Sequence, residues 1–429
     1  MNPPAPENEG RVGRIADDLF RREGSRIVAM LAGQLGIQRL QLAEDVVQEA
    51  LVRALQTWPY RGVPDNPAAW LMQTAKHLAL DQLRREQRWY EKQDGIAAAH
   101  ERWLSTEPAD VRDDGTFDDD TLRMMFVCTH PQLSEEARIA LALRTLCGFS
   151  PAEIASAFLT TEAAVSKRLV RARQRIRELE LPFVVPESDE LPLRLDGVMQ
   201  TLYLMFNEGY KASSGGSLVR EDLCREAIRL TSLLTHHPAT RLQKVHALLA
   251  LMLLNAARFS GRTDVSGNPL RLSEQDRSSW DRGLITEGIR QLGLAAAGDQ
   301  LSEYHLEAGI AACHCTASSD EATDWPRILS LYDRLLEMTD SPVVALNRAV
   351  AVWKVNGAEA GLKSLAEIKS RGVLDSYHLF HVVRGTFEVE LGRRDEALIH
   401  FRKAESLANL PSEREFIAAR IRECGSAGV

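Results

Sequence analysis

The sequence has 429 residues, of which 45% are hydrophobic and 26% are charged, and its formal net charge at pH 7 is −8. This length leaves room for two to four globular domains. The longest apolar run, Ala247 to Leu254, is far shorter than the roughly 18 residues of a membrane span. Six scattered cysteines form no disulfide framework, and the polar, proline-rich start resembles no signal peptide. These features exclude a membrane protein and a disulfide-stapled secreted domain, and they predict a cytoplasmic protein whose residues 1–13 are a disordered tail.

Residues 14–90 are predicted to form helices. The stretch from Gln41 to Trp58 places apolar and acidic side chains on different faces of one helix. The acidic residues lie in its N-terminal half, where the helix dipole favours negative charge. Two explanations therefore stay open: a stabilising dipole contact, or a docking surface for a basic partner. The predicted inner face is Val47, Leu51, Ala54, Leu55 and Trp58, and the predicted outer face is Glu44, Asp45, Gln48 and Glu49.

A turn-rich loop, PYRGVPDNP over residues 59–67, precedes a second amphipathic helix that ends at Trp89-Tyr90. Its apolar positions are predicted to face the core. Basic residues interleaved with aromatic rings suit single-stranded nucleic acid, because guanidinium groups follow phosphates and rings stack on bases. The outward set comprises Lys76, His77, Asp81, Arg84, Arg85 and Arg88.

The next segment, residues 91–120, has the opposite charge. From Glu101 to Asp120 it holds eight acidic residues and two arginines, a net charge of −6. A flexible, solvated linker explains this composition. Helices are then expected to return at residue 121, with Cys128 and Cys147 as buried core residues.

Residues 150–178 have the pattern of a helix-turn-helix. Ser150-Pro151-Ala152-Glu153 predicts a capping box with proline at the first helical position. After a turn at Leu159-Thr160, the apolar residues Val165, Leu169, Ala172 and Ile176 recur at helical spacing. The remaining arc is almost entirely basic in a chain that is acidic as a whole, which favours DNA binding over an ordinary solvated face. That arc contains Lys167, Arg168, Arg171, Arg173, Arg175 and Arg177.

These two blocks carry a family resemblance. AEDVVQEALVRALQTW followed by PAAWLMQTAKHLALDQLRR resembles region 2 of bacterial RNA polymerase sigma factors, and SPAEIASAFLTTEAAVSKRLVRARQRIRE resembles their region 4. The order and spacing are similar to those of the compact extracytoplasmic-function group of the sigma-70 family. The resemblance implies that the chain binds core RNA polymerase at the β′ clamp helices and the β flap, recognises promoter DNA and needs no catalytic residue. It also implies that the acidic linker follows the basic RNA path of the polymerase.

The resemblance assigns roles residue by residue. Asp45, Gln48 and Glu49 would dock on the polymerase. The set for the −10 element, including a base flipped from the non-template strand, is Asp65, Asn66, Lys76, His77, Arg84, Arg85 and Arg88. The set for the −35 element is Ser166, Lys167, Arg168, Arg171 and Arg175. Among these, arginines early in the helix are expected to pair with guanine and later ones to meet phosphates.

Residues 181–192 contain three prolines and are interpreted as a short linker after region 4, which spans 121–180. Residues 193–429, here called the extension, are predicted to be helical. Gly357 and Gly392 each precede a Glu-Ala pair and lie about 35 residues apart, close to the tetratricopeptide period. The extension resembles the tetratricopeptide-like domain of one branch of these sigma factors. Apolar residues of the linker, Leu191 and Leu193 among them, are expected to be buried between region 4 and the extension.

Two features of the extension suggest chemistry. Cys313-His314-Cys315 has too few convincing partners for a zinc site, so buried helix residues are the preferred interpretation. Asn207 to Tyr210 and Ser213 to Gly216 indicate either a pocket loop or helix capping. No nucleotide-binding, hydrolase or zinc-protease motif is present, so neither an enzyme nor a cofactor is predicted. The fold prediction is all-α, and the alternative function is a polymerase-independent helix-turn-helix regulator whose repeats serve dimerisation or ligand sensing.

Overall fold

The structure is a computed structural model that describes residues 23–36, 39–90, 119–179, 186, 190–213, 219–264, 268–369 and 371–426. In these ranges every extended regular element is a helix, and β pairing is limited to an isolated bridge between Thr263 and Pro269. The predicted all-α class is confirmed. The expected tail, most of the acidic linker and most of residues 181–192 lie outside the described residues.

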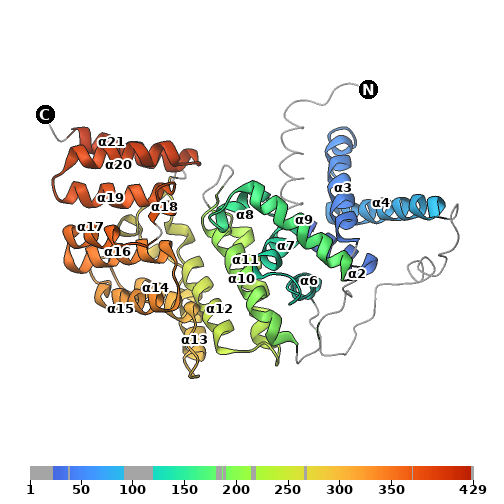
Figure 1. The fold of residues 1–429 in the computed structure, drawn as a ribbon, viewed down its shortest axis with the longest axis horizontal. Helices are drawn as coiled ribbons and strands as arrows, with labels where there is room; N and C mark the ends of the chain where they lie inside the picture. Colours follow the sequence, from blue (N-terminus) through green and yellow to red (C-terminus); the bar gives the residue numbers. More distant parts are fainter. Residues whose placement is uncertain are drawn as a thin grey trace. The chain divides into compact units, whose positions relative to one another are not determined.

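The chain divides into two compact units, Met1–Thr201 and Leu202–Val429. In the first unit the helices run from the blue to the green part of Figure 1. They are α2 (Ser25–Leu35), α3 (Leu40–Arg61), α4 (Pro67–Tyr90), α6 (Asp120–Cys128), α7 (Glu135–Leu146), α8 (Pro151–Ala157), α9 (Glu162–Glu178) and the first half of α10 (Leu191–Tyr210).

Helix α6 lies at the centre of the first unit. Leu122, Met124 and Phe126 are fully buried, and Cys128 at its end is buried as predicted. A helix that is apolar on all sides must be covered on all sides. Helices α2 and α7 supply part of that cover, and α2 in turn packs on α3. The elements of residues 23–90 and 120–178 therefore share one core.

The division between the units falls inside α10, not within residues 181–192. The first half of α10 belongs to the first unit because Arg194 donates to the Phe126 carbonyl (3.2 Å) and Gly197 approaches Thr129 closely. Leu191 is buried, but Leu193 is 70% exposed. The expected burial of the linker's apolar face is therefore wrong for Leu193.

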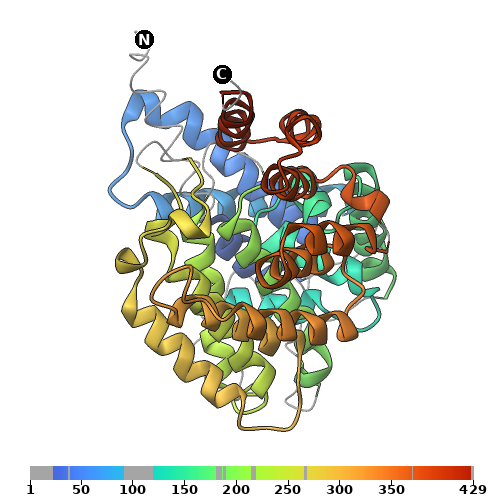
Figure 2. The same ribbon diagram turned by 90° about the vertical axis from the view of Figure 1, so that its left-hand side faces the viewer.

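The second unit is a succession of antiparallel helices. Neighbouring helices pack along the chain from α11 to α21, and in Figure 1 they lie one above another from α14 to α21, while Figure 2 shows the last of them nearly end-on. They are α11 (Glu221–His236), α12 (Gln243–Ala256), η4 (Phe259–Gly261), η5 (Leu272–Glu274), η6 (Arg277–Ser279), α13 (Arg282–Ala295), α14 (Glu303–Thr316), α15 (Trp325–Met338), α16 (Pro342–Asn356), α17 (Ala358–Ala366), α18 (Arg371–Leu374), α19 (His378–Glu390), α20 (Arg394–Leu407) and α21 (Pro411–Ser426).

Both glycines of the repeated pattern lie where a helix has just ended. Gly357 follows α16 with φ +85°, and Gly392 follows α19 with φ +75°. Glycine tolerates this left-handed conformation because it has no Cβ atom. Each turn leads into the next helix, so the repeated Gly and Glu-Ala pattern marks two helix pairs of similar construction.

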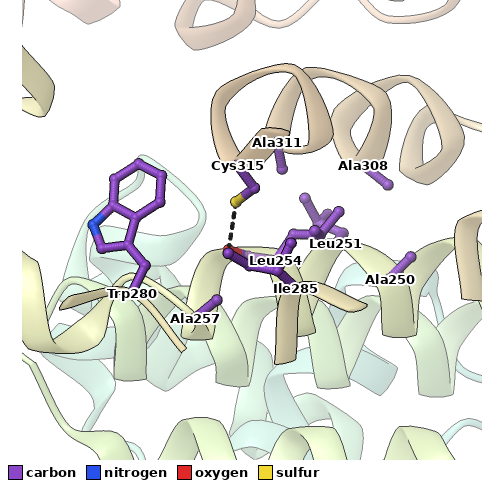
Figure 3. Packing of buried hydrophobic residues seen from close by; sticks show 9 residues of the cluster. All are labelled: Ala250, Leu251, Leu254, Ala257, Trp280, Ile285, Ala308, Ala311 and Cys315. Carbon is purple, nitrogen blue, oxygen red and sulfur yellow. Dashed lines mark hydrogen bonds between the residues drawn. The ribbon is translucent and has the colours of Figure 1, made fainter. Parts of the chain in front are cut away.

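Residues 313–315 are part of α14. The Cys315 thiol donates to the Leu254 carbonyl (3.2 Å) within the cluster that also holds Trp280 and Ile285, as Figure 3 shows. His314 packs edge-on against Trp325, with ring centroids 5.3 Å apart. Within the described ranges no group of three or more acidic, histidine or cysteine side chains could hold a metal ion. No described helix is long and apolar enough to cross a membrane.

Candidate nucleic-acid interface

Local chemistry builds the helix-turn-helix as predicted. The Ser150 amide donates to the Glu153 carboxylate (2.7 Å) and the Glu153 amide donates to the Ser150 hydroxyl (3.1 Å), which is a complete capping box before Pro151. Leu159 forms the turn at φ +50°. The Thr161 hydroxyl then caps α9 by accepting from the Ala164 amide (3.3 Å). Both helix starts are thus satisfied by side chains of the sequence itself.

Helix α9 is anchored by the stripe that its sequence indicates. Val165, Leu169, Ala172 and Ile176 are all buried, and α9 packs on α7 and α8. At 100° per residue, the opposite side of the helix falls on Ala163, Lys167, Val170 and Gln174, all of which are exposed. We call this side, with the exposed Arg171 beside it, the outer face of α9.

Arg168 does not belong to the outer face. Its guanidinium forms an ion pair with Glu136 of α7 and lies 5.7 Å from the centre of the Phe158 ring. Its side chain is 23% exposed, because position 168 is on the flank of α9 next to the buried stripe. This arrangement does not favour the predicted contact of Arg168 with base edges, because its guanidinium already contacts Glu136 and Phe158.

The other predicted −35 residues are exposed, but they differ in their ion pairs. Ser166, Lys167 and Arg171 are exposed. Arg175 is also exposed and lies 3.8 Å from Glu178, one turn further along α9. Arg173, which the sequence placed in the basic arc, turns instead toward α3 and binds Glu44 at 2.6 Å.

Helix α3 presents the predicted acidic residues to solvent. Asp45, Gln48 and Glu49 are exposed on one side; Asp45 accepts from Gln41 (2.8 Å) and Glu49 pairs with Arg53 (3.1 Å). The sequence interpretation was wrong for Glu44, which is only 9% exposed. It was also wrong for Leu55, which was predicted to be inward but is 40% exposed, beside Val52 at 45%. The surface therefore combines carboxylates with two aliphatic side chains that sequence reasoning missed.

The predicted −10 residues lie on the loop before α4 and along α4. The Asn66 side chain caps α4 by accepting from the Ala69 amide (3.0 Å), while Asp65 is exposed. Lys76 is half-buried, and His77, Arg84 and Arg85 are exposed, with Arg84 3.7 Å from Asp81. Trp58 and Trp70 pack edge to face beneath the loop, 5.4 Å apart. The side chain of Arg88 lies outside the described residues.

The described part of the segment from Asn207 to Ser213, a candidate pocket loop in the sequence, is held by a hydrogen bond and an ion pair of one buried carboxylate. Glu208 is buried, accepts from the Ser213 amide (2.9 Å) and lies 3.9 Å from Arg220. These contacts hold the chain where α10 ends. Residues 214–218, which include the rest of the proposed loop, lie outside the described residues.

Comparison with protein families agrees with this geometry. A model described as Sigma-70 region 2 matches residues 19–89, and a model described as Sigma-70, region 4 matches residues 123–176. The chain contains sigma-70 regions 2 and 4. Region 2 comprises α2, α3 and α4, and region 4 runs from within α6 through α9. A third model, described as a family of unknown function (DUF6596), matches residues 194–296 of the extension.

Full-length comparison adds two relatives. A protein of Rhizobium meliloti that is named only as uncharacterized is 40% identical over 391 residues, which cover 90% of each chain. The chain therefore belongs to the same family as this rhizobial protein. The probable ECF RNA polymerase sigma factor SigI of Mycobacterium tuberculosis is 29% identical over 149 residues, which cover 34% of this chain and 48% of SigI. No solved structure matches the chain.

One buried carboxylate joins region 2 to region 4. Glu44 of α3 accepts from the Thr145 hydroxyl of α7 (2.8 Å) and from the Arg173 guanidinium of α9 (2.6 Å). The Glu44 side chain is 11% exposed and that of Arg173 is 21% exposed. Charge-assisted hydrogen bonds in such a setting are stronger than those at an open surface. The described structure is thus one in which the two regions are packed together.

Proposed function

We propose that this protein is an alternative sigma factor of the extracytoplasmic-function group, which binds core RNA polymerase in the cytoplasm and directs it to a small set of promoters. The observation that carries the proposal is the presence, in order, of region 2 with an exposed acidic side on α3 and region 4 with a basic outer face on α9. A DNA-binding regulator without polymerase needs only the second of these. The proposal needs no catalytic residue, because the polymerase performs the chemistry.

The division of work follows the exposed surfaces. Asp45, Gln48 and Glu49 dock on the β′ clamp helices, and the neighbouring Val52 and Leu55 supply apolar contact area that an isolated acidic patch lacks. Region 4 meets the β flap and places α9 in the major groove of the −35 element. The loop before α4 and the basic side of α4 contact the opened −10 element, where a flipped base costs a few kcal/mol to extrude.

We further propose that the extension is tetratricopeptide-like and regulates the sigma factor. Its support is the recurrence of helix pairs with small residues at close approaches. A Cβ atom on Gly361 of α17 would lie 2.8 Å from Phe387 of α19, and one on Gly385 of α19 would lie 2.6 Å from Phe401 of α20. Helix pairs that stack in this way bury a core only between neighbours, which is the logic of a solenoid. The partner or small molecule that the extension senses would bind along these stacked helices.

Charge reversal on α3 tests the proposed function. The double variant Asp45→Lys/Glu49→Lys should lose co-purification with core polymerase, because it reverses the charge of the proposed docking surface. Both carboxylates are exposed and neither pairs with a buried cation, so the fold should be kept. Glu337→Lys/Glu367→Lys changes the net charge equally at exposed positions of the extension and should bind polymerase normally. Equal binding by the first variant and the wild type would reject the sigma assignment and favour the operator-binding regulator.

A further inference from the structure

The outer face of α9 is not uniformly polar. Val170 lies at its middle and is 60% exposed, while its neighbours on that face are Lys167, Arg171 and Gln174. Lys167 and Arg171 form no ion pair with any described residue, and Gln174 donates to Glu178 (2.9 Å). Val170 is therefore the apolar centre of a surface whose surroundings are hydrogen-bonding groups.

Val170 contributes little buried surface to its own domain. A β-branched residue in a helix interior costs conformational freedom relative to the straight-chain residues that favour helices. Val170 recovers little of that cost through burial, because the apolar stripe of α9 lies on the opposite side of the helix. Its position, in contrast, is well placed for DNA. It lies at the midpoint of α9, about 12 Å along the axis from Glu162, on the side opposite the buried stripe. In a helix-turn-helix the second helix lies in the major groove.

Major-groove chemistry restricts what Val170 can contact. Three of the four bases present only hydrogen-bond donors and acceptors there, and thymine alone adds an apolar group, its C5-methyl. A valine pressed against a donor or acceptor would remove water from it without replacing the hydrogen bond, which is unfavourable. Against a methyl group, the same side chain buries apolar surface from both partners. The chemistry of Val170 thus selects thymine.

We propose that Val170 reads the C5-methyl group of one thymine in the −35 element, between a phosphate contact of Lys167 and a backbone or base contact of Arg171. This inference rests on the proposed function. It also replaces part of the expected readout, because Arg168 is held by Glu136 and Phe158 and leaves the outer face to other residues.

Replacement of thymine by uracil tests the inference, since uracil pairs identically and lacks only the methyl group. Holoenzyme reconstituted from the full chain and core polymerase is titrated on a duplex promoter that it selects, with each thymine of the −35 element replaced in turn. At one position the wild type should bind the uracil duplex about fourfold more weakly, the equivalent of one buried methylene. Val170→Ala should bind both duplexes equally at that position.

Two control variants define the readout. Ile399→Ala removes a comparably exposed aliphatic side chain from α20 of the extension and should keep the wild-type preference for thymine. Lys167→Gln should weaken binding to the thymine and uracil duplexes alike and reduce the salt dependence, as expected for a phosphate contact. A wild-type holoenzyme that selects promoters but ignores every thymine methyl would overturn the inference, as would a Val170→Ala variant that keeps the preference. Failure of the wild type to select any promoter would instead overturn the proposed function.

Discussion

Arg168 and Arg171 are three residues apart on α9 but should respond differently to removal. Arg168→Ala breaks the ion pair with Glu136 and the contact with Phe158, so we expect a loss of about 1 kcal/mol in folding stability. Promoter ranking should stay unchanged. Arg171→Ala should leave thermal unfolding unaltered and weaken promoter binding, because its side chain is exposed on the outer face. Differential scanning calorimetry with binding assays on several promoters separates the two. A changed promoter ranking in Arg168→Ala would show that this arginine leaves Glu136 when DNA binds.

His314 should make the extension sensitive to acid. Burial, with repulsion from Arg258 and Arg277, lowers the pKa of His314 to about 4, whereas an unfolded histidine titrates near 6.5. Between these values the unfolded state binds more protons, so stability falls as pH falls. His314→Phe keeps the ring against Trp325 and removes the titration. Urea unfolding at pH 7 and pH 5 should show a wild-type loss about 2 kcal/mol larger than that of the variant. Parallel losses would contradict the assignment.

For single residues, the sequence correctly predicted the features that depend on the spacing of neighbouring residues. The capping box at Ser150 and the buried stripe of α9 follow from positions a few residues apart, and both were correct. The contact between Arg173 and Glu44 was missed because the two residues are 129 positions apart in the chain. An outward-facing charge and a charge with a distant partner look the same in a helical pattern.

At the element scale, α19 and α20 meet at a position that admits no side chain. Gly385→Ala would place a Cβ atom 2.6 Å from the buried Phe401 ring, so we expect destabilisation of about 1–3 kcal/mol from overpacking. Gly293→Ala is the matched control, since this helical glycine of α13 has nothing within 4 Å and should gain about 0.5–1 kcal/mol. Chemical denaturation measures both. Gly385→Ala combined with Phe401→Leu should recover stability, and a tolerated single variant would show that the two helices can separate freely.

The positions of the helices were easier to predict from the sequence than the contacts that their side chains make. The helices around Gln41–Trp58 and residues 68–90 were expected, and α3 and α4 occupy these positions with α3 continuing through Pro59 to Arg61. Pro59 has no amide hydrogen for the helical bond to residue 55, and α3 ends two residues later at Arg61. Leu55 was predicted to face inward because the spacing of apolar residues shows which side of a helix is apolar. That spacing does not show how much of the apolar side the neighbouring helices cover. In the sequence, an aliphatic residue that contacts a partner protein therefore has the same pattern as a core residue.

At the scale of the whole molecule, α10 links region 4 to the extension. A chain truncated after Leu181 should lose most promoter activity and become less soluble, because it removes the α10 residues that cover α6, including Arg194 and Gly197. A chain truncated after Thr201 keeps this cover and should be more soluble than the shorter one. Soluble yield and run-off transcription compare the two. If either truncated protein transcribes more strongly than the full chain, the extension is an inhibitor.

Glu44 should control how readily regions 2 and 4 separate. Glu44→Gln removes the charge that holds Arg173 while keeping an acceptor for Thr145, so the free protein should expand and bind promoter DNA more tightly without polymerase. Glu135→Gln on α7 makes the same charge change at an exposed position and should do neither. Small-angle scattering and DNA titration measure the two effects. An unchanged radius of gyration in Glu44→Gln would mean that other contacts dominate.

The Glu44 contact has a consequence for the order of assembly. The −10 and −35 elements are about 85 Å apart at 3.4 Å per base pair. The proposed −10 helix, α4, is about 36 Å long and packs on α3, and α3 touches α9, which is about 26 Å long. The packed form therefore cannot span a promoter. If its contacts favour it by about 2 kcal/mol, roughly 3 in 100 free molecules are extended at any moment. Promoter search by the free chain is then rare. Under the proposed function, docking of α3 on the polymerase is the step that releases α9 toward DNA.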